Sequence, residues 1–212
     1  MSLHPDIQSR LHFLLDENLT EPERFQKFDA PASPYINPEK VELTDLLIDG
    51  PNGKVPIRLY GQTSLGLDKV PTLVWIHGGG FTEGGLWQVE SDVVAKELSS
   101  ALPIRVIAVD YRLCSETVKL DKTMQDNMAV LDWIFSNSEN LFHQELVAVG
   151  GNSAGGAIAA FLALHKSQND EKQICGVVLT SPVLHSKLPT INSDIADKIA
   201  SLPGIGLTKE GV

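Results

Sequence analysis

A serine between glycines, placed where an apolar run gives way to a helical pattern, limits the fold of this chain more than any other feature. Residues 151–155 are Gly-Asn-Ser-Ala-Gly; residues 146–149 predict a strand, and a helical pattern begins at Ala154. A serine on so tight a strand-to-helix turn has a strained backbone, and only small neighbours avoid a clash with it. We therefore expect Ser153 to stand at a strand end as a nucleophile, beside the N-terminal dipole of the next helix. The alternative is a glycine-rich helix start that serves close packing alone.

Strand and helix patterns alternate along the middle of the chain. Nearly continuous apolar runs, typical of strands buried on both faces, occupy residues 72–76, 104–109, 146–149 and 175–179. Apolar residues at helical spacing lie between them, at residues 89–98, 124–135 and 158–165. This order predicts an α/β fold with a mostly parallel central sheet, helices on both faces and right-handed crossovers.

Two further strand patterns, residues 41–48 and 55–60, precede this alternation. The five residues between them are Asp-Gly-Pro-Asn-Gly, and this composition favours a turn of the hairpin type. Strands joined by so short a turn run in opposite directions. We therefore expect the sheet to begin with an antiparallel pair at its N-terminal edge.

A second glycine-rich segment follows the strand predicted at residues 72–76. Residues 77–81 are His-Gly-Gly-Gly-Phe, and the three glycines let the backbone approach another group without a Cβ in the way. Acyl transfer requires N–H donors aimed at the oxyanion of its tetrahedral intermediate. We assign this function to the N–H groups of Gly79, Gly80 and Ala154. His77 precedes the glycines at a strand end and is expected to support the loop; a flexible loop is the alternative reading of the segment.

These motifs resemble those of the hormone-sensitive-lipase-like branch of the α/β-hydrolases, over roughly residues 41–184. The resemblance extends to Val109-Asp110-Tyr111-Arg112-Leu113, Glu116, Asp126, Asp132-Trp133 and Thr180-Ser181-Pro182-Val183-Leu184. Two departures affect one pocket wall. Cys114-Ser115 replaces the usual Ala-Pro, and the proline-rich stretch that normally follows is missing.

The resemblance implies an α/β-hydrolase fold and an organisation into three parts. Residues 1–40, a helix and an extended segment, would form part of a lid, and residues 41–186 would form the core. Residues 187–212 resemble the start of a lid insertion that is incomplete. We therefore expect a chain truncated at its C-terminus, with the last strands of the fold missing.

The implied activity is carboxylic-ester hydrolysis through acylation of Ser153, without a cofactor or metal. In this fold a catalytic acid and then a histidine follow the serine. After Ser153 the chain has only His165, about 18 Å further along the same helix, and His185, which could approach the site. We expect this chain to be inactive or weak. A non-catalytic binding or interaction protein is the alternative, and a serine peptidase is a third reading.

Composition limits the partners of the chain. The net charge of -10 and the isoelectric point near 5.0 disfavour nucleic acid, and no apolar run is long enough to span a membrane. Two cysteines in 212 residues make no disulfide framework, which favours a reducing, cytoplasmic compartment. The expected partner is a small-molecule ester, and an exposed sheet edge would favour self-association.

Overall fold

The computed structural model describes residues 9, 11–20, 23–24, 27, 40–62, 70–137, 142–143, 145–169 and 174–185. The chain divides into two compact units, Met1–Pro182 and Val183–Val212. Of the helix expected near the N-terminus, the structure describes α2 (Leu11–Leu14). The predicted lid insertion at residues 187–212 lies outside the described residues, as does most of the segment 1–40. In the described part of the chain, no helix combines the length and apolar character that crossing a membrane requires.

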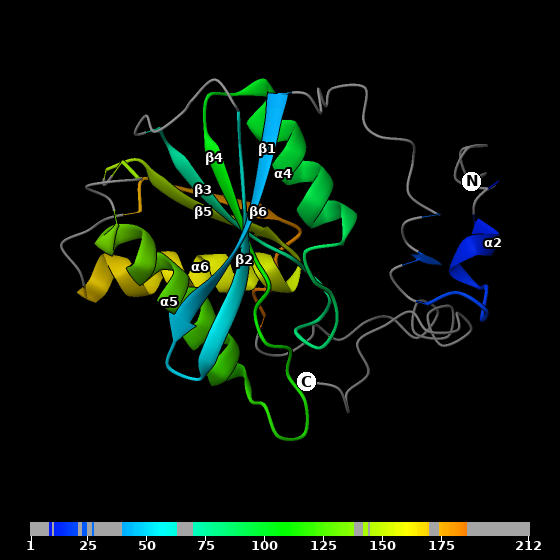
Figure 1. The fold of residues 1–212 in the computed structure, drawn as a ribbon. Helices are drawn as coiled ribbons and strands as arrows, with labels where there is room; N and C mark the ends of the chain where they lie inside the picture. The colour runs from blue at the N-terminus through cyan, green and yellow to red at the C-terminus, as the bar shows by residue number, and fades with distance from the viewer. Residues whose placement is uncertain are drawn as a thin grey trace. The chain divides into compact units, whose positions relative to one another are not determined.

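One sheet organises the first unit, and among the described residues it has six strands in the order β1-β2-β4-β3-β5-β6 (Figure 1). Neighbours β4, β3, β5 and β6 are parallel, whereas β1 pairs antiparallel with β2 and β2 antiparallel with β4. This arrangement confirms the predicted α/β fold with its antiparallel N-terminal edge. The strands are β1 (Val41–Gly50), β2 (Gly53–Gln62), β3 (Thr72–Ile76), β4 (Arg105–Val109), β5 (Val147–Asn152) and β6 (Gly176–Thr180).

The hairpin of β1 and β2 is tighter than its composition suggested. Gly50 pairs with Gly53, so each strand is two residues longer than expected at the turn, and only Pro51 and Asn52 remain in the connection. Gly53 has a φ of 111°, a backbone conformation that side chains with a Cβ rarely adopt. Glycine at this position therefore lets β2 pair along its whole length.

Helices cover both faces of the sheet, and alternation along the strands assigns the core residues to them. Figure 1 shows α5 (Leu120–Ser136) and α6 (Ala154–Asn169) on one side and α4 (Val89–Ala101) on the other. In β3, Val74 and Ile76 pack in the cluster that contains α5 and α6 residues, whereas Leu73 and Trp75 pack in the cluster of α4. All five residues of β3 are buried, as expected for a central parallel strand.

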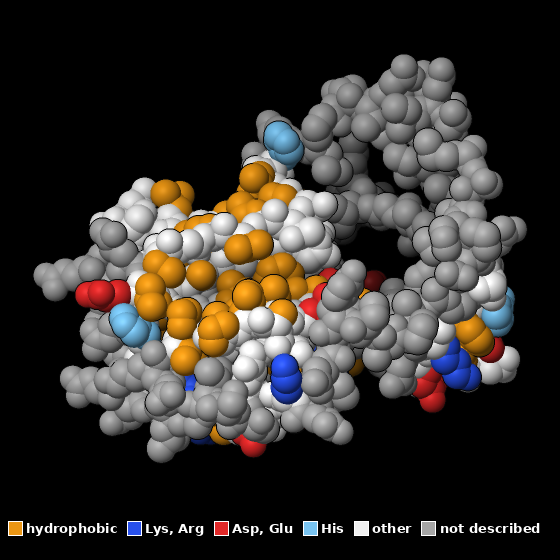
Figure 2. Space-filling view, turned by 90° about the horizontal axis from the view of Figure 1, so that it is seen from above, with side chains coloured by type: hydrophobic (Ala, Val, Ile, Leu, Met, Phe, Trp, Pro, Cys, Tyr) orange, Lys and Arg blue, Asp and Glu red, His pale blue; other side chains and the backbone are white. Residues whose placement is uncertain are grey.

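The strand β6 differs from the expectation of burial on both faces. Val177, Val178 and Leu179 are 45%, 50% and 38% exposed, so the prediction for residues 175–179 was right about the strand but wrong about its burial. The reason is position, since among the described residues β6 is the last strand of the sheet and pairs with β5 alone. Phe161 and Leu164 of the adjacent α6 are also exposed. Figure 2 shows a face on which apolar side chains gather and charged side chains are few.

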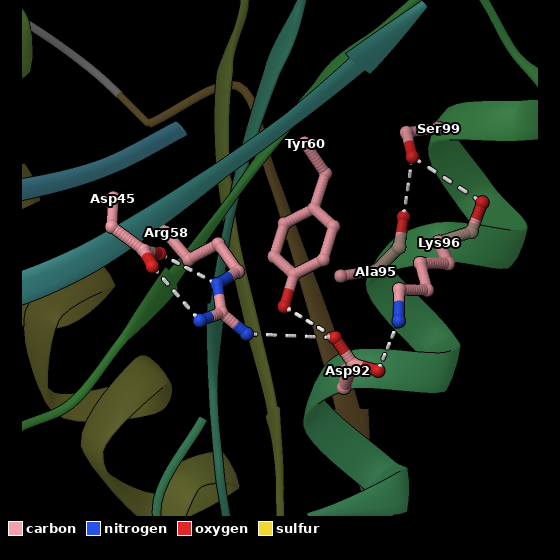
Figure 3. Close-up of polar contacts among 7 residues, drawn as sticks. All are labelled: Asp45, Arg58, Tyr60, Asp92, Ala95, Lys96 and Ser99. Atoms are coloured by element: carbon pink, nitrogen blue, oxygen red, sulfur yellow. Dashed lines mark hydrogen bonds and ion pairs between the residues drawn. The ribbon is translucent and has the colours of Figure 1, made fainter. Parts of the chain in front are cut away.

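A polar network joins the antiparallel edge to α4 (Figure 3). Asp92 of α4 accepts a hydrogen bond of 2.9 Å from the Tyr60 hydroxyl and one of 2.5 Å from Lys96. Arg58 binds Asp45 of β1 through two nitrogen atoms, at 2.6 and 3.0 Å, and lies 3.9 Å from Asp92. Asp92 is therefore one of the groups that connect the sheet edge to the helix; Gln62 of β2, which donates to the Ser100 carbonyl at 3.2 Å, is another.

This network predicts that removal of its two carboxylates lowers the stability of the fold by different amounts. Asp92→Ala leaves the hydroxyl of Tyr60, a residue that is 0% exposed, without its acceptor, and should lower the free energy of unfolding by about 1–3 kcal/mol. Asp45→Ala removes an exposed ion pair and should cost less than about 1 kcal/mol. Urea unfolding of both variants measures the difference. Equal losses would contradict a specific function for Asp92.

Candidate active site

Ser153 lies on a sharp turn between β5 and α6. Its φ is 52°, in the left-handed region, which confirms the unusual backbone expected from the sequence. β5 ends at Asn152 and α6 begins at Ala154, so the serine alone makes the connection. Its N–H donates to the carbonyl of Thr180 in β6 at 2.9 Å, and its own carbonyl accepts from Ala157 in α6 at 3.2 Å. Neighbouring elements thus hold the strained residue on both sides.

Glycines allow this turn to pack against the end of β3. A Cβ on Gly155 would overlap with the carbonyl oxygens of Ile76 and His77, and a Cβ on Gly151 would also overlap with that of Ile76. A Cβ on Gly78 would lie 3.3 Å from the Cβ of Ser153. The two glycine-rich motifs, more than 70 residues apart in sequence, therefore meet because β3 and β5 are paired neighbours.

The loop after β3 folds back on itself. Gly79, Gly80 and Phe81 have φ values of 105°, 59° and 69°. The Gly79 carbonyl accepts hydrogen bonds from the N–H groups of Thr82 and Glu83, at 3.0 and 2.9 Å. Among the described residues, no hydrogen bond uses the N–H of Gly79, Gly80 or Ala154.

His77 is buried beneath this loop. Its Nδ1 lies 2.7 Å from the Gly78 carbonyl; because a carbonyl can only accept, Nδ1 carries the proton. Nε2 is buried and has no partner among the described residues. Burial lowers the pKa of His77 to about 4, although the bond to the Gly78 carbonyl opposes this shift. The ring is therefore neutral at pH 7. Its buried position beneath the loop agrees with the expectation that His77 holds the loop in place.

The segment after β4 contacts the same loop, a feature that the sequence motifs did not assign. Tyr111 stacks on His77 with ring centroids 4.2 Å apart and 9° between the planes. Its hydroxyl donates to the carbonyls of His77, at 3.0 Å, and of Gly78, at 3.3 Å. The resemblance included Tyr111 without a function, because nothing local in the sequence indicates which loop a buried tyrosine reaches.

The two histidines after Ser153 are exposed. His165 lies on α6 and stacks on Phe161 one turn away. Twelve residues of helix separate it from Ser153, or about 18 Å. His185 belongs to the second unit. Among the described residues, no histidine or carboxylate forms a hydrogen bond with the Ser153 hydroxyl.

A surface hollow of about 430 Å³ lies away from both motifs. It is lined by Ile48, Asp49, Pro51, Ala129, Asp132, Trp133 and Ser136. Both of its carboxylates are already paired, Asp49 with Lys54 at 2.6 Å and Asp132 with Lys166 at 2.7 Å. It has no serine activated by its neighbours and no cluster of free charges, so the candidate site remains the turn at Ser153.

Comparisons with known proteins agree with this fold. The sequence model of the family described as "alpha/beta hydrolase fold" matches residues 73–205. The chain is 36% identical over 134 residues to the carboxylic ester hydrolase LipN of Mycobacterium tuberculosis, covering 62% of this chain and 34% of LipN. It is 33% identical over 172 residues to the carboxylesterase NlhH of the same organism, covering 75% of this chain and 51% of NlhH. The chain thus spans about a third to a half of these relatives.

Solved structures give the same result. A hyperthermophilic esterase from the archaeon Pyrobaculum calidifontis superposes with a TM-score of 0.70 and 26% identity, over 90% of this chain and 62% of that one. A bacterial heroin esterase superposes with a TM-score of 0.69 and 27% identity, over 89% and 60% of the two chains. The chain belongs to the α/β-hydrolase family, in its hormone-sensitive-lipase-like branch.

The close approach of the turn to β3 predicts that Gly155→Ala disrupts the site. The new Cβ overlaps with backbone oxygens, which cannot move without displacing β3. The free energy of unfolding should therefore fall by about 3 kcal/mol or more. Gly176→Ala is the matched control, because its Cβ would lie 3.7 Å from the Ala148 Cβ, an ordinary contact. Thermal unfolding compares the variants, and equal stability would contradict the packing described here.

Burial of neutral His77 predicts a pH dependence of stability. Its pKa falls from 6.5 in the unfolded chain to about 4, so the unfolded state binds more protons between these values. The contribution of neutral His77 to the free energy of unfolding is therefore complete above pH 6.5. It is lost as the pH falls through 4, which lowers the free energy of unfolding by about 3 kcal/mol. Urea unfolding at pH 7 and pH 4 should show a smaller loss for His77→Gln than for the parent chain. Substitution of exposed His165 by Gln is the control and should keep the full loss.

Proposed function

We propose that this chain carries the nucleophile and oxyanion hole of a serine carboxylic-ester hydrolase. Ser153 is the nucleophile, and the N–H groups of Gly79, Gly80 and Ala154 receive the oxyanion. The observation that carries the proposal is the meeting of the two glycine-rich motifs, with Gly78 against the Cβ of Ser153. The left-handed φ of Ser153 supports it, because backbone strain of this kind is concentrated at functional sites. The relatives are named as carboxylic-ester hydrolases and esterases, which also supports the proposal over a non-catalytic binding protein.

The chemistry follows from these groups. The Ser153 oxygen attacks the ester carbonyl carbon as its proton passes to a base, and the carbonyl oxygen becomes negative. The N–H donors and the N-terminal dipole of α6 stabilise that charge. The tetrahedral intermediate then expels the alcohol, which takes a proton, and leaves an acyl group on Ser153. Water attacks this acyl group through a second tetrahedral intermediate and releases the carboxylic acid.

The base is the component that the described residues do not supply beside Ser153. A serine hydroxyl is a weak nucleophile without one. The Ser153 hydroxyl can still attack an activated ester slowly while solvent takes its proton, because the N–H donors stabilise the oxyanion. The proposal for the 212-residue chain is therefore slow turnover of small esters that depends on Ser153.

The test is hydrolysis of p-nitrophenyl butyrate by the purified chain beside three variants. Ser153→Ala should abolish the weak turnover, because no other group receives the acyl chain. His185→Ala and His165→Ala should leave it within about twofold of the parent, since neither histidine is assigned as the base. Turnover that survives in Ser153→Ala would contradict the proposed function. Robust turnover lost equally in Ser153→Ala and His185→Ala would instead make His185 the base.

We also propose that the β6 edge favours self-association. An unpaired edge strand presents its N–H and C=O groups to other chains, and exposed apolar side chains on β6 add to the attraction. Val178→Lys should therefore lower the apparent mass in size-exclusion chromatography, because a charge on an edge strand opposes pairing. Leu47→Lys, on the opposite edge strand β1, is the control. It should change nothing, because β1 already carries the charged Glu42, Asp45 and Asp49, which oppose pairing. A monomeric parent chain would contradict this part of the proposal.

The proposed compartment is the cytoplasm. Both cysteines, Cys114 and Cys175, are free thiols, and Cys175 is exposed. A reducing compartment keeps such thiols unpaired, whereas an oxidising one favours disulfides. The proposed partner is a small-molecule ester rather than a nucleic acid, because the net charge is -10.

A further inference from the structure

The segment after β4 holds both ends of the glycine loop. At the start of the loop, the Tyr111 hydroxyl donates to the carbonyls of His77 and Gly78. At its end, the N–H of Cys114 donates to the Phe81 carbonyl at 2.8 Å. Tyr111 is only 2% exposed, so water does not compete for its hydroxyl. The loop is thus attached to a neighbouring segment and not only to itself.

The hydrogen bonds to the Gly78 carbonyl also determine the direction of the Gly79 N–H. The carbonyl of Gly78 and the N–H of Gly79 belong to one planar trans peptide unit, so they point in opposite directions. Two donors hold that carbonyl: His77 Nδ1 at 2.7 Å and the Tyr111 hydroxyl at 3.3 Å. Whatever fixes the carbonyl therefore also fixes the direction of the Gly79 N–H, away from the two buried rings.

External support of this kind is required because glycine does not orient itself. Gly79 and Gly80 both have positive φ, and a glycine backbone populates many other conformations at similar energy. An N–H donor that must find its direction during the reaction stabilises an oxyanion less than a preorganised one. The strength of the proposed oxyanion hole thus depends on the groups behind the loop.

We propose that Tyr111 is a positioning residue of the proposed oxyanion hole, which directs the Gly79 N–H by holding the carbonyls of His77 and Gly78. This inference rests on the proposed function of the glycine loop. The segment that carries Tyr111 is itself anchored on α5. Asp126 accepts hydrogen bonds from the N–H and Nε of Arg112, at 3.0 and 2.6 Å, and the Thr123 hydroxyl donates to the Arg112 carbonyl at 2.8 Å.

The experiment measures binding of butylboronic acid, a probe of the oxyanion hole that does not require turnover. The Ser153 oxygen bonds to boron and releases a proton to the solvent, and the resulting tetrahedral boronate carries its negative charge where the oxyanion would lie. The parent chain should bind the probe and Ser153→Ala should not. Tyr111→Phe keeps the ring stacked on His77 and removes only the hydroxyl, and should weaken binding about 10-fold, less than loss of a whole donor.

The matched control is Tyr60→Phe. Tyr60 is 0% exposed, and its hydroxyl donates a part-buried hydrogen bond to Asp92 on the other face of the sheet (Figure 3). This variant should bind the probe as the parent does. If Tyr111→Phe binds as tightly as the parent, or Tyr60→Phe weakens binding equally, the positioning function of Tyr111 is overturned while the site stands. If the parent shows no binding that depends on Ser153, the proposed function itself fails.

A second variant covers the case in which Tyr111→Phe does not fold. Thr123→Val has nearly the same shape and removes the bond that holds the Arg112 carbonyl, one residue beyond Tyr111. It should weaken boronate binding in the same direction by about threefold. For p-nitrophenyl butyrate, kcat should fall while KM stays within about twofold, because the loop acts on the transition state. Unchanged boronate affinity and kcat would overturn the inference.

Discussion

The structure depends on a backbone contact without side chains, where the turn between β5 and α6 rests on the end of β3. Gly151 and Gly155 bring this turn so close to the Ile76 carbonyl that no Cβ fits between them. The contact places Ser153 at the end of β5, close to Gly78 in the loop that follows the neighbouring strand β3. Close packing and the proposed chemistry therefore depend on the same contact, and the glycines would serve both.

The same region accumulates unfavourable local conformations that the rest of the sheet compensates. Ser153 and Phe81 have positive φ without being glycine, which costs about 1–3 kcal/mol each. The Nε2 of His77 is buried without a partner among the described residues. Buried clusters on both faces of the sheet hold these groups in place. Burial of these clusters stabilises the fold, and this stabilisation offsets the cost of the strained, rigid loop.

The sequence predicted the order and type of the elements well, because each element has its own periodicity. The apolar runs became β3, β4, β5 and β6, and the turn composition correctly predicted the antiparallel pair β1 and β2. The burial of β6 was predicted wrongly, because an apolar run records what a strand can bury and not whether a neighbour is present. The extra pairing at Gly50 and Gly53 was missed, since hairpin register depends on turn geometry that composition only outlines.

For the site, the sequence by itself determined the two motifs, the strained serine and the small residues around it. These follow from local sterics, which a few neighbouring residues decide. Only the tertiary structure decided that Tyr111 reaches the carbonyls of His77 and Gly78, and that His77 is buried with its pKa lowered to about 4. Both facts depend on which strands lie side by side. Tyr111 and His77 are 34 residues apart in the sequence, and they meet because β4 and β3 are parallel neighbours. Side-chain direction and burial across such a separation are set by packing, and no local pattern in the chain records them.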